Sequence, residues 1–352
     1  MTGDPCIPAP VLRGFLAAAL VSGGLPEGDA ATVARLMVEA DLLGAEGHGT
    51  FRLPRYMARL RAGGFNTLPD IRPVAQKGGL ALLDGDNAMG HLVMERAAHL
   101  AVDLARSHGI GWVGTRRSNH AGAAGVYATM VAEAGMAGLY LAVGNANHMA
   151  PWGGTELLLS TNPIAIALPA PGHPVLLDMA TTVAAYGKVK LAAQRGQQMP
   201  EGWMIDASGN PLTDPAQAAG GSLLPIGGPK GFGLSLMFGL LAGTLNGAAF
   251  GRDVIDFNAD DRTETNTGQA VLALDLSVLG DPAVLAAQVG AVCDDIRASA
   301  LRPGFDAIRL PGDRSLGGRE DRLARGIPLS PALLAQLDQL AAEQGIAPLN
   351  RS

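Results

Sequence analysis

The chain has 352 residues, a formal net charge of −6 and only 16% charged residues, against about 25% in an ordinary globular protein. A mildly acidic chain without a basic block is not expected to bind nucleic acid, and two cysteines supply neither a disulfide framework nor a zinc ligand set. Hydrophobic residues make up 48% of the chain, which is enough for a large core and for two domains.

Helices are predicted at both ends of the chain. Apolar residues recur at helical spacing over residues 10–22 and 26–43, and Pro54 opens a third predicted helix over 54–62. Residues 66–73 are interpreted as a connector. Further helices are predicted over 282–299 and 330–343. We expect residues 1–72 and 281–352 to form one discontinuous helical domain.

Residues 73–280 are predicted to form an α/β (α+β) domain, because short apolar strands alternate with helices. The expected strands span 79–84, 111–115, 136–143, 163–168, 175–178 and 269–274. The expected helices span 90–107, 121–134 and 183–195, and residues 199–215 are predicted to be a polar excursion.

One apolar segment, residues 232–251, is the nearest approach to a membrane span, and a helix is expected over residues 234–245 within it. Its flanking glycines and polar residues favour a buried core helix instead. The first ten residues lack the basic and apolar regions of a signal peptide. We therefore expect a cytoplasmic protein without a membrane contact.

A histidine between two glycines is the most distinctive feature of the sequence. His48 follows Gly47 and precedes Gly49, and Arg52 and Tyr56 should lie on one face of the helix that follows. Imidazole exchanges protons near neutral pH, and guanidinium holds carboxylates in a bidentate fork. The pattern suits a reaction on a small carboxylate, but the spacing alone favours a surface loop before a solvated basic helix.

Polar loops follow several predicted strands and are inferred to meet at one cleft. They span residues 118–122, 144–154, 160–163 and 178–182. His120 and Asp178 are the candidate functional residues among them, although N-capping and turn chemistry would also explain these loops. No histidine pair has the spacing of a metal site, so no metal is expected.

Two glycine-rich segments could bind a phosphate. In residues 109–114 a GxGxxG pattern follows a predicted helix and precedes a strand, which is the reverse of a Rossmann site. Residues 227–233 instead precede a helix and contain Lys230, so they could hold a pyrophosphate. A tightly packed loop with a solvated lysine is the alternative for this second segment.

Eight motifs together give the chain a family resemblance. They are D-L-x-G-x-x-x-H-G-x-x-R-L-P-x-Y at residues 41–56, S-N-H-x-G-A-A-G at 118–125, A-P-W-G-G at 150–154, T-N-P-I-A at 161–165, L-D-M-A-T-T at 177–182, G-W-x-x-D at 202–206, P-x-G-G-x-K-G-x-G-L at 225–234 and L-P-G-D-R at 310–314. From about residue 11 to 328, the chain closely resembles the type-2 malate/lactate dehydrogenase family, which also contains ureidoglycolate and sulfolactate dehydrogenases, diketogulonate reductase and Δ1-piperideine-2-carboxylate reductase. The resemblance implies a non-Rossmann NAD(P) oxidoreductase that is usually a homodimer.

The resemblance also implies roles for individual residues. His48 is the expected proton donor, Arg52 and Tyr56 are expected to contact the substrate, and His120 and Asp178 are the other expected catalytic residues. The expected cofactor contacts are Ser118, His120, Thr161, Asn162, Pro163, Asp178, Met179, Ala180, Lys230, Gly231, Pro311, Gly312, Asp313 and Arg314. The family usually has a serine where this chain has Gly47, and three alternatives follow. His48 works with Asp178 alone, or a water molecule replaces the serine hydroxyl, or His120 carries the proton instead.

The sequence therefore predicts an oxidoreductase that transfers a hydride from NADP or NAD to C2 of a small 2-oxo acid. A cyclic 2-imino acid reductase is the alternative, because the ending L-P-G-D-R is similar to that of the cyclic-imine reductases. An inactive nucleotide-binding protein on the same scaffold is a second alternative, favoured only by Gly47. NADPH is slightly favoured over NADH, since Arg116 and Arg117 could meet a 2′-phosphate.

Overall fold

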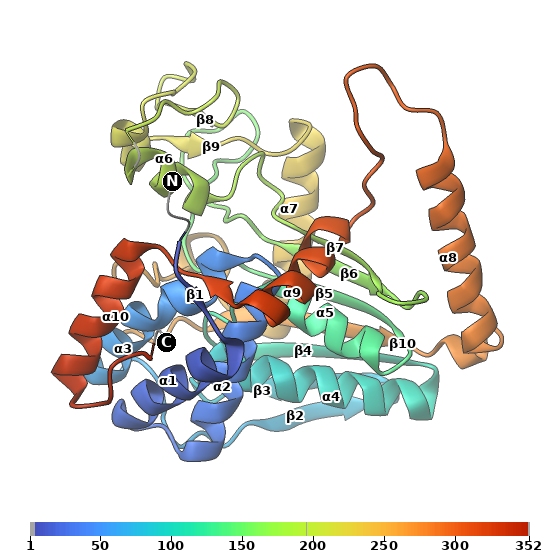
Figure 1. Cartoon of the computed structure of the whole chain (residues 1–352), viewed down its shortest axis with the longest axis horizontal. Helices are drawn as coiled ribbons and strands as arrows, with labels where there is room; N and C mark the ends of the chain where they lie inside the picture. The colour runs from blue at the N-terminus through green and yellow to red at the C-terminus, as the bar shows by residue number, and fades with distance from the viewer. Residues whose placement is uncertain (1–3, 195, 351–352) are drawn as a thin grey trace.

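The structure is a computed structural model that describes residues 4–194 and 196–350. Figure 1 shows its elements coloured along the chain. The strands are β1 (Cys6–Ile7), β2 (Arg72–Lys77), β3 (Leu80–Asp84), β4 (Ile110–Ser118), β5 (Ala137–Ala142), β6 (Ile164–Leu168), β7 (Val175–Met179), β8 (Met204–Ile205), β9 (Ser222–Leu223), β10 (Thr267–Leu274) and β11 (Ile327–Pro328). The α-helices are α1 (Ala9–Ser22), α2 (Glu27–Leu42), α3 (Leu53–Ala62), α4 (Gly90–His108), α5 (Ala124–Glu133), α6 (Tyr186–Gln194), α7 (Pro229–Ala242), α8 (Pro282–Ala298), α9 (Asp313–Arg325) and α10 (Pro331–Gln344).

A mixed sheet of seven strands forms the centre of the molecule, in the order β2-β3-β4-β10-β5-β6-β7. Its neighbours run antiparallel except for β3 and β4, which are parallel and joined through α4. A Rossmann domain has a mostly parallel sheet. The expected α/β (α+β), non-Rossmann class is therefore confirmed.

The sheet is covered on both faces around β5. Successive side chains of a strand point to opposite faces. Tyr140 accordingly belongs to the core under α4 and α5, whereas Leu139 and Leu141 pack with residues of α7 on the other face. Figure 1 shows α4 and α5 lying across the near face of the sheet.

The helical part of the molecule is built from both ends of the chain. Helices α1 and α2 pack on each other, and α10 packs on α1 and α3. Their shared core contains Leu16, Met37, Tyr56 and Leu337. By contrast α8, which was expected in the same unit, has no buried residue and stands apart from it in Figure 1. The domain limits at residues 72/73 and 280/281 stay a prediction.

Most of the expected elements are present, with boundaries shifted by a few residues. Elements that lack a clear apolar period were not foreseen: β2, the pairs β1–β11 and β8–β9, and α9. The excursion expected over 199–215 is instead part of a small lobe, which encloses its own apolar cluster of Val189, Met204 and Leu223. The helix predicted over 183–195 appears as α6, and Arg195 lies outside the described residues.

The expectation of a buried helix over 234–245 is wrong. Helix α7 packs one side on the sheet through Phe238 and Leu241, but Leu234 is 43% exposed and Met237 is 54% exposed. Hydropathy reports only that a segment avoids water, not which surface covers it. In the described part of the chain, no helix is both long enough and apolar enough to cross a membrane.

Candidate active site

The segment that carries His48 is a pair of short 3₁₀ turns that leads into α3. Asp41, at the end of α2, accepts hydrogen bonds from Thr50 through the backbone N–H (2.8 Å) and the hydroxyl (2.5 Å). A Cβ at Gly49 would collide with the same carboxylate, so only glycine fits beside it. Pro54 then lies in the first turn of α3, which begins at Leu53. The turn therefore holds His48 and Arg52 at the start of the helix that bears Tyr56.

His48, His120 and Tyr56 form a continuous chain of contacts. Nδ1 of His48 lies 3.4 Å from Nε2 of His120, and Nδ1 of His120 lies 2.6 Å from the Tyr56 hydroxyl oxygen. The two imidazole rings stack with their centroids 5.5 Å apart. His120 comes from the loop after β4, whereas the other two residues come from the helical part of the molecule. The structure thus brings together two histidines that are 72 residues apart in sequence.

The neighbouring donors fix the proton positions in this chain. The backbone N–H of Gly122 can only donate, and it points at Nδ1 of His120 across 3.3 Å. A neutral His120 therefore carries its proton on Nε2 and donates it toward Nδ1 of His48. His48 in turn carries its own proton on Nε2. That N–H has no hydrogen-bond partner among the described residues, so it is free to donate to a ligand.

Burial keeps all three side chains uncharged near neutral pH. It lowers the pKa of His48 to about 4, and the positive charge of Arg52 lowers that pKa further. The pKa of His120 is lowered well below its usual value, first by burial and then by Arg52 and His48. The pKa of Tyr56 is raised by burial. A neutral hydrogen-bonded chain therefore lies beside a fixed guanidinium charge.

Arg52 is a half-buried cation without an acidic partner. Its Nε donates to the carbonyl oxygen of Gly47 (2.8 Å), and Nη1 donates to the side-chain oxygen of Asn258 (3.0 Å). No carboxylate forms an ion pair with it in residues 4–194 and 196–350. The adjacent Arg55, in contrast, pairs with Asp261 at 3.0 Å. Arg52 therefore retains donors for the carboxylate of a ligand.

Sequence reasoning missed the residues that cover this site. The ring of Phe257 lies 5.7 Å from that of His120, and its neighbour Asn258 holds Arg52. His91, on α4, is 1% exposed, and neither ring nitrogen has a hydrogen-bond partner among the residues that the structure describes; its ring meets Tyr56 edge-on at 5.4 Å. The loop at Phe257 lies about two hundred positions from α3 and carries no motif, so no local signal could have identified it.

Asp178 lies at the end of β7 as expected, but it contacts neither histidine by a hydrogen bond in the described chain. Its carboxylate accepts the backbone N–H of Gly125, in the first turn of α5, at 2.8 Å. Desolvation of the carboxyl group by the surrounding protein raises the pKa of Asp178 to about 6, although part of the residue remains accessible to solvent. The side chain that contacts the ring of His48 is His120. This contact was not among the three options left open by Gly47, which had His120 only as a replacement for His48.

The other polar loops contact one another, while their meeting at one cleft stays a prediction. The side-chain oxygen of Asn162 accepts from Gly144 N–H (3.1 Å), and its amide donates to Ser235 of α7. Thr181 bonds the carbonyl oxygen of Thr161 through its backbone N–H and its hydroxyl. Asn162 and Ser118 are fully buried. Their side chains therefore support the loops from inside, while Thr161, Pro163, Met179 and Ala180 are half-buried.

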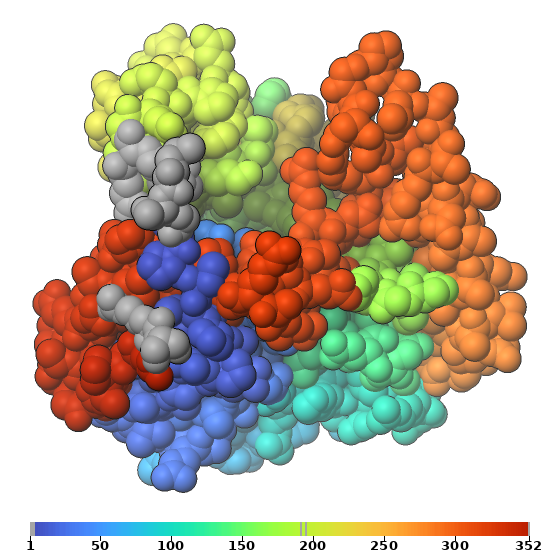
Figure 2. All heavy atoms as spheres, viewed as in Figure 1, coloured from blue at the N-terminus to red at the C-terminus, as the bar shows by residue number. Residues whose placement is uncertain are grey.

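The remaining expected cofactor contacts lie around β7 and at the start of α7. Lys230 is exposed in the first turn of α7, next to the buried Gly231. Pro311 accepts a hydrogen bond from Leu176 of β7 at 3.2 Å. Pro311, Gly312 and Asp313 line a pocket of about 570 Å³ between the β6–β7 turn, α8 and the start of α9, and Arg314 is exposed beside it. Figure 2 shows the molecule hollowed between α8 and the lobe around α6.

These residues fit a dinucleotide cofactor. Helix α7 begins at Gly228 without a side-chain cap, so its first N–H groups are free to bind an anion, and Lys230 adds a positive charge there. No group of three or more metal-ligating side chains is placed to hold a metal ion within the described residues. The arrangement can thus bind an anionic cofactor, hold a carboxylate at Arg52 and donate a proton from His48.

Comparison with known proteins identifies the class of this enzyme. The family model described as malate/L-lactate dehydrogenase matches residues 7–338. The chain belongs to this family of NAD(P)-dependent oxidoreductases, whose members include enzymes named for NAD⁺ and for NADP⁺. The malate dehydrogenase of Pyrococcus abyssi is 38% identical over 349 residues, which cover 97% of this chain and 95% of that one.

Solved structures agree in fold over nearly the whole chain. The sulfolactate dehydrogenase of Methanocaldococcus jannaschii is 34% identical and superposes with a TM-score of 0.90, covering 97% of this chain and 98% of its own. The Δ1-piperideine-2-carboxylate reductase of Pseudomonas syringae is 30% identical with a TM-score of 0.83, covering 96% and 99%. The same scaffold is therefore used for 2-hydroxy acids and for a cyclic imine.

Proposed function

We propose that this enzyme transfers a hydride between NAD(P)H and C2 of a small 2-oxo acid, as a 2-hydroxy acid dehydrogenase. The proposal rests on two donors in the same site. The Nε2–H of His48 has no partner among the described residues, and the guanidinium of Arg52 has no acidic partner there. A 2-oxo acid presents a ketone oxygen that must gain a proton beside a carboxylate that must be held. The site offers one group for each.

In this proposal His48 gives its Nε2 proton to the C2 oxygen. His120 and Tyr56 hold the ring in place through the chain of contacts behind it, and His48 recovers its proton from solvent. The nicotinamide cofactor supplies the hydride when it is bound. A substrate carboxylate at Arg52 offsets the positive charge that lowers the pKa of His48, so substrate binding favours uptake of the proton that the reaction uses.

Lys230, Gly231 and the start of α7 are proposed to hold the cofactor pyrophosphate, while Met179, Ala180 and residues 311–314 line the rest of its path. Asp178 is proposed to order this region through Gly125 and α5 rather than to bond a histidine. The choice between NAD and NADP stays open. Arg116 and Arg117 are bound to acidic residues, which removes the reason for favouring NADPH.

A cyclic 2-imino acid is the second candidate substrate. It too has a carboxylate beside the carbon that accepts the hydride, and the similarity to the Pseudomonas syringae reductase favours it. The inactive nucleotide-binding alternative rested only on Gly47. The intact contacts of His48, His120 and Tyr56 argue against it, because an unused site has no need of a buried proton chain.

We also propose that the enzyme is a homodimer. Helix α8 has no buried residue and exposes Val292 and Ile296, and α7 exposes Leu234 and Met237. Apolar faces of this extent are usually covered in the working protein. A cytoplasmic location is proposed as well; Cys6 and Cys293 are both free, which fits a reducing compartment.

The test is a spectrophotometric screen of pyruvate, oxaloacetate and Δ1-piperideine-2-carboxylate with NADH and with NADPH, and of ureidoglycolate in the oxidative direction. We expect turnover of at least one 2-oxo acid. Turnover of the cyclic imine alone would select the second candidate. Tight binding of NADH or NADPH, measured by fluorescence, without turnover of any compound would overturn the proposal.

A further inference from the structure

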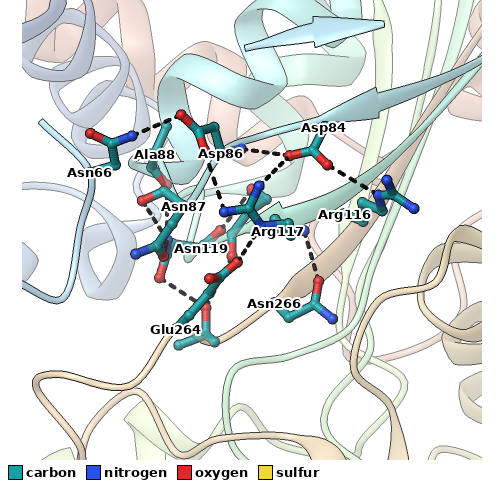
Figure 3. Close-up of polar contacts among 12 residues, drawn as sticks. Asn66, Asp84, Asp86, Asn87, Ala88, Arg116, Arg117, Asn119, Glu264 and Asn266 are labelled. Carbon is teal, nitrogen blue, oxygen red and sulfur yellow. Dashed lines mark hydrogen bonds and ion pairs between the residues drawn. The ribbon is translucent and has the colours of Figure 1, made fainter. Parts of the chain in front are cut away.

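All non-glycine residues with a left-handed backbone in residues 4–194 and 196–350 lie in a single polar network. They are Asp86 (φ 48°), Asn87 (φ 58°), Arg117 (φ 49°) and Asn266 (φ 44°). Figure 3 shows this network. Asn and Asp tolerate that conformation, whereas a long side chain such as Arg117 rarely adopts it. Such backbones persist only where their surroundings hold them, and they gather at functional sites.

Arg117 holds the network together. Its guanidinium bonds three carboxylates: Glu264 at 2.9 Å, Asp84 at 3.1 Å and Asp86 at 3.3 Å. Its backbone N–H donates to the side chain of Asn266 (2.8 Å), and its carbonyl oxygen accepts from Asn87 (2.8 Å). These contacts join the ends of β3 and β4 to the loop before β10, as Figure 3 shows.

One end of the network fixes the residue before His120. Asn119 is fully buried, and its amide donates to the side chain of Asn87 and to the carbonyl oxygen of Ala88, both at 2.9 Å. Its own side-chain oxygen accepts from Thr265 at 2.9 Å. The backbone at Asn119 thus has no freedom to move without breaking the contacts of Asn87.

The other end of the network reaches the helical part that carries His48. Asn66, just beyond α3, donates to Asp86 through its side chain (2.8 Å) and to the carbonyl oxygen of Asn87 through its backbone (2.9 Å). The network therefore joins the element that presents His120 to the helix that presents Tyr56. The contacts within the proton chain depend on the relative position of these two parts.

We propose that Arg117 is a positioning residue, which sets the spacing of His120 against His48 and Tyr56 by fixing the joint between the sheet and the helical part. It touches neither histidine. The proposal rests on the proposed function for its chemical meaning. It also gives Arg117 a role other than binding a 2′-phosphate, since its donors are already bound to carboxylates.

The test compares Arg117→Gln with Arg116→Gln. Arg116 also bonds Asp84, but its backbone is not left-handed. We expect Arg117→Gln to lower kcat by about 10–100-fold, the size of effect that a misplaced reacting group produces. KM should change little, and the solvent deuterium isotope effect on kcat should rise, because proton delivery becomes limiting. Arg116→Gln should stay close to wild type in each measurement.

A second variant guards against a failure to fold. Asn87→Gly keeps the left-handed backbone at no steric cost but removes the side-chain oxygen that accepts from Asn119. It should shift kcat and the isotope effect in the same direction as Arg117→Gln. Lower activity with an unchanged isotope effect in both variants would show a merely structural role and overturn the proposal.

A spectrum taken without substrate separates this proposal from the proposed function. In protein with ¹⁵N-labelled imidazoles, wild type should show His120 with its proton on Nε2, and Arg117→Gln should show a mixture of tautomers. An unchanged His120 signal in Arg117→Gln and in Asn87→Gly would overturn the positioning role. If the wild type turned over no acid or imine, only the proposed function would fail, and this spectrum would still decide the role of Arg117.

Discussion

The proton chain at His48 and the apolar face of α8 differ in how completely the rest of the protein surrounds them. At the first, His120, Tyr56, Phe257 and Asn258 surround the reacting group, and the described residues hold His48 and Arg52 while leaving each a donor for a ligand. At the second, Val292 and Ile296 lie 57% and 45% exposed, and no residue of the helix is buried. The first region is therefore finished by folding, whereas the second is left uncovered within a single chain.

The largest effect is expected from a substitution in the proton chain at His48. His48→Ala should lower kcat by about 10²–10⁴-fold, the usual range for a lost general acid or base. Steady-state kinetics on an accepted 2-oxo acid checks this. His99→Ala, exposed on α4, is the matched control and should be silent. Wild-type turnover by His48→Ala would remove His48 from the mechanism.

Arg52→Gln tests the carboxylate contact in the same region. A charge-assisted hydrogen bond contributes about 1.5–3 kcal/mol, so loss of a bidentate contact should lower kcat/KM for the acid by about 10²-fold. The affinity for NADH, measured by fluorescence, should not change. Arg55→Gln removes a neighbouring arginine that is already paired with Asp261, and it should leave KM near wild type. An equal rise of KM in both variants would refute the assignment.

The exposed apolar face of α8 is tested by placing charged residues on it. Val292→Asp with Ile296→Asp places two carboxylates on the exposed apolar face of α8, since residues four apart share a face of a helix. We expect the dimer to dissociate at least about tenfold more readily, because burying an unpaired charge costs several kcal/mol. Sedimentation velocity across a concentration series measures this. Asp295→Asn, on the same helix, is the control, and a wild-type profile for the double variant would place the interface elsewhere.

His91 gives a pH-dependent contrast within the finished region. Burial lowers its folded-state pKa to about 3, from the ordinary value of 6.5. Below pH 6.5 the unfolded chain binds a proton that the folded protein does not, so stability is lost as the pH falls toward 3. His91→Gln should remove about 2 kcal/mol of the loss between pH 7 and 5, at about 1.4 kcal/mol per pH unit. Urea unfolding at both pH values measures it, with exposed His99→Gln as control, and an unchanged pH dependence would contradict the burial argument.

The same contrast explains what could be predicted from sequence. Local patterns suffice for α3, where Pro54 and Gly63 mark both ends, and for strands such as β5 that are apolar throughout. They fail for α9, whose residues DRSLGGREDRLAR are mostly charged residues and glycines, and for β2, whose residues are all exposed. They also cannot show that α7 and α8 bury little within one chain, since hydropathy is the same whether a face is covered by its own chain or by another.

The site divides in the same way. His48, Arg52 and Tyr56 are close in sequence, so helical geometry alone places them together. The pairing of His48 with His120, and of Arg52 with Asn258, depends on contacts between distant segments that no spacing reports. The family resemblance named both histidines, but it offered Asp178 as the partner of His48 and His120 only as an alternative proton donor. In our proposal, the contact between His48 and His120 depends on the network around Arg117. No sequence pattern predicts the left-handed backbone of that residue.

The smallest expected effect concerns Gly47, the departure that first put the proton chain in doubt. An added Cβ at Gly47 would meet no atom within 4 Å, and its backbone is not left-handed, so Gly47→Ser should fold normally. Nδ1 of His48 already has His120 as its partner, which leaves the new hydroxyl little to do for the orientation of the ring. We expect kcat to stay within about threefold of wild type, a change of well under 1 kcal/mol in the barrier. A tenfold or greater rise in kcat would show that the contact with His120 does not by itself orient His48 for proton transfer. The active site would then lack the serine hydroxyl that Gly47 replaces.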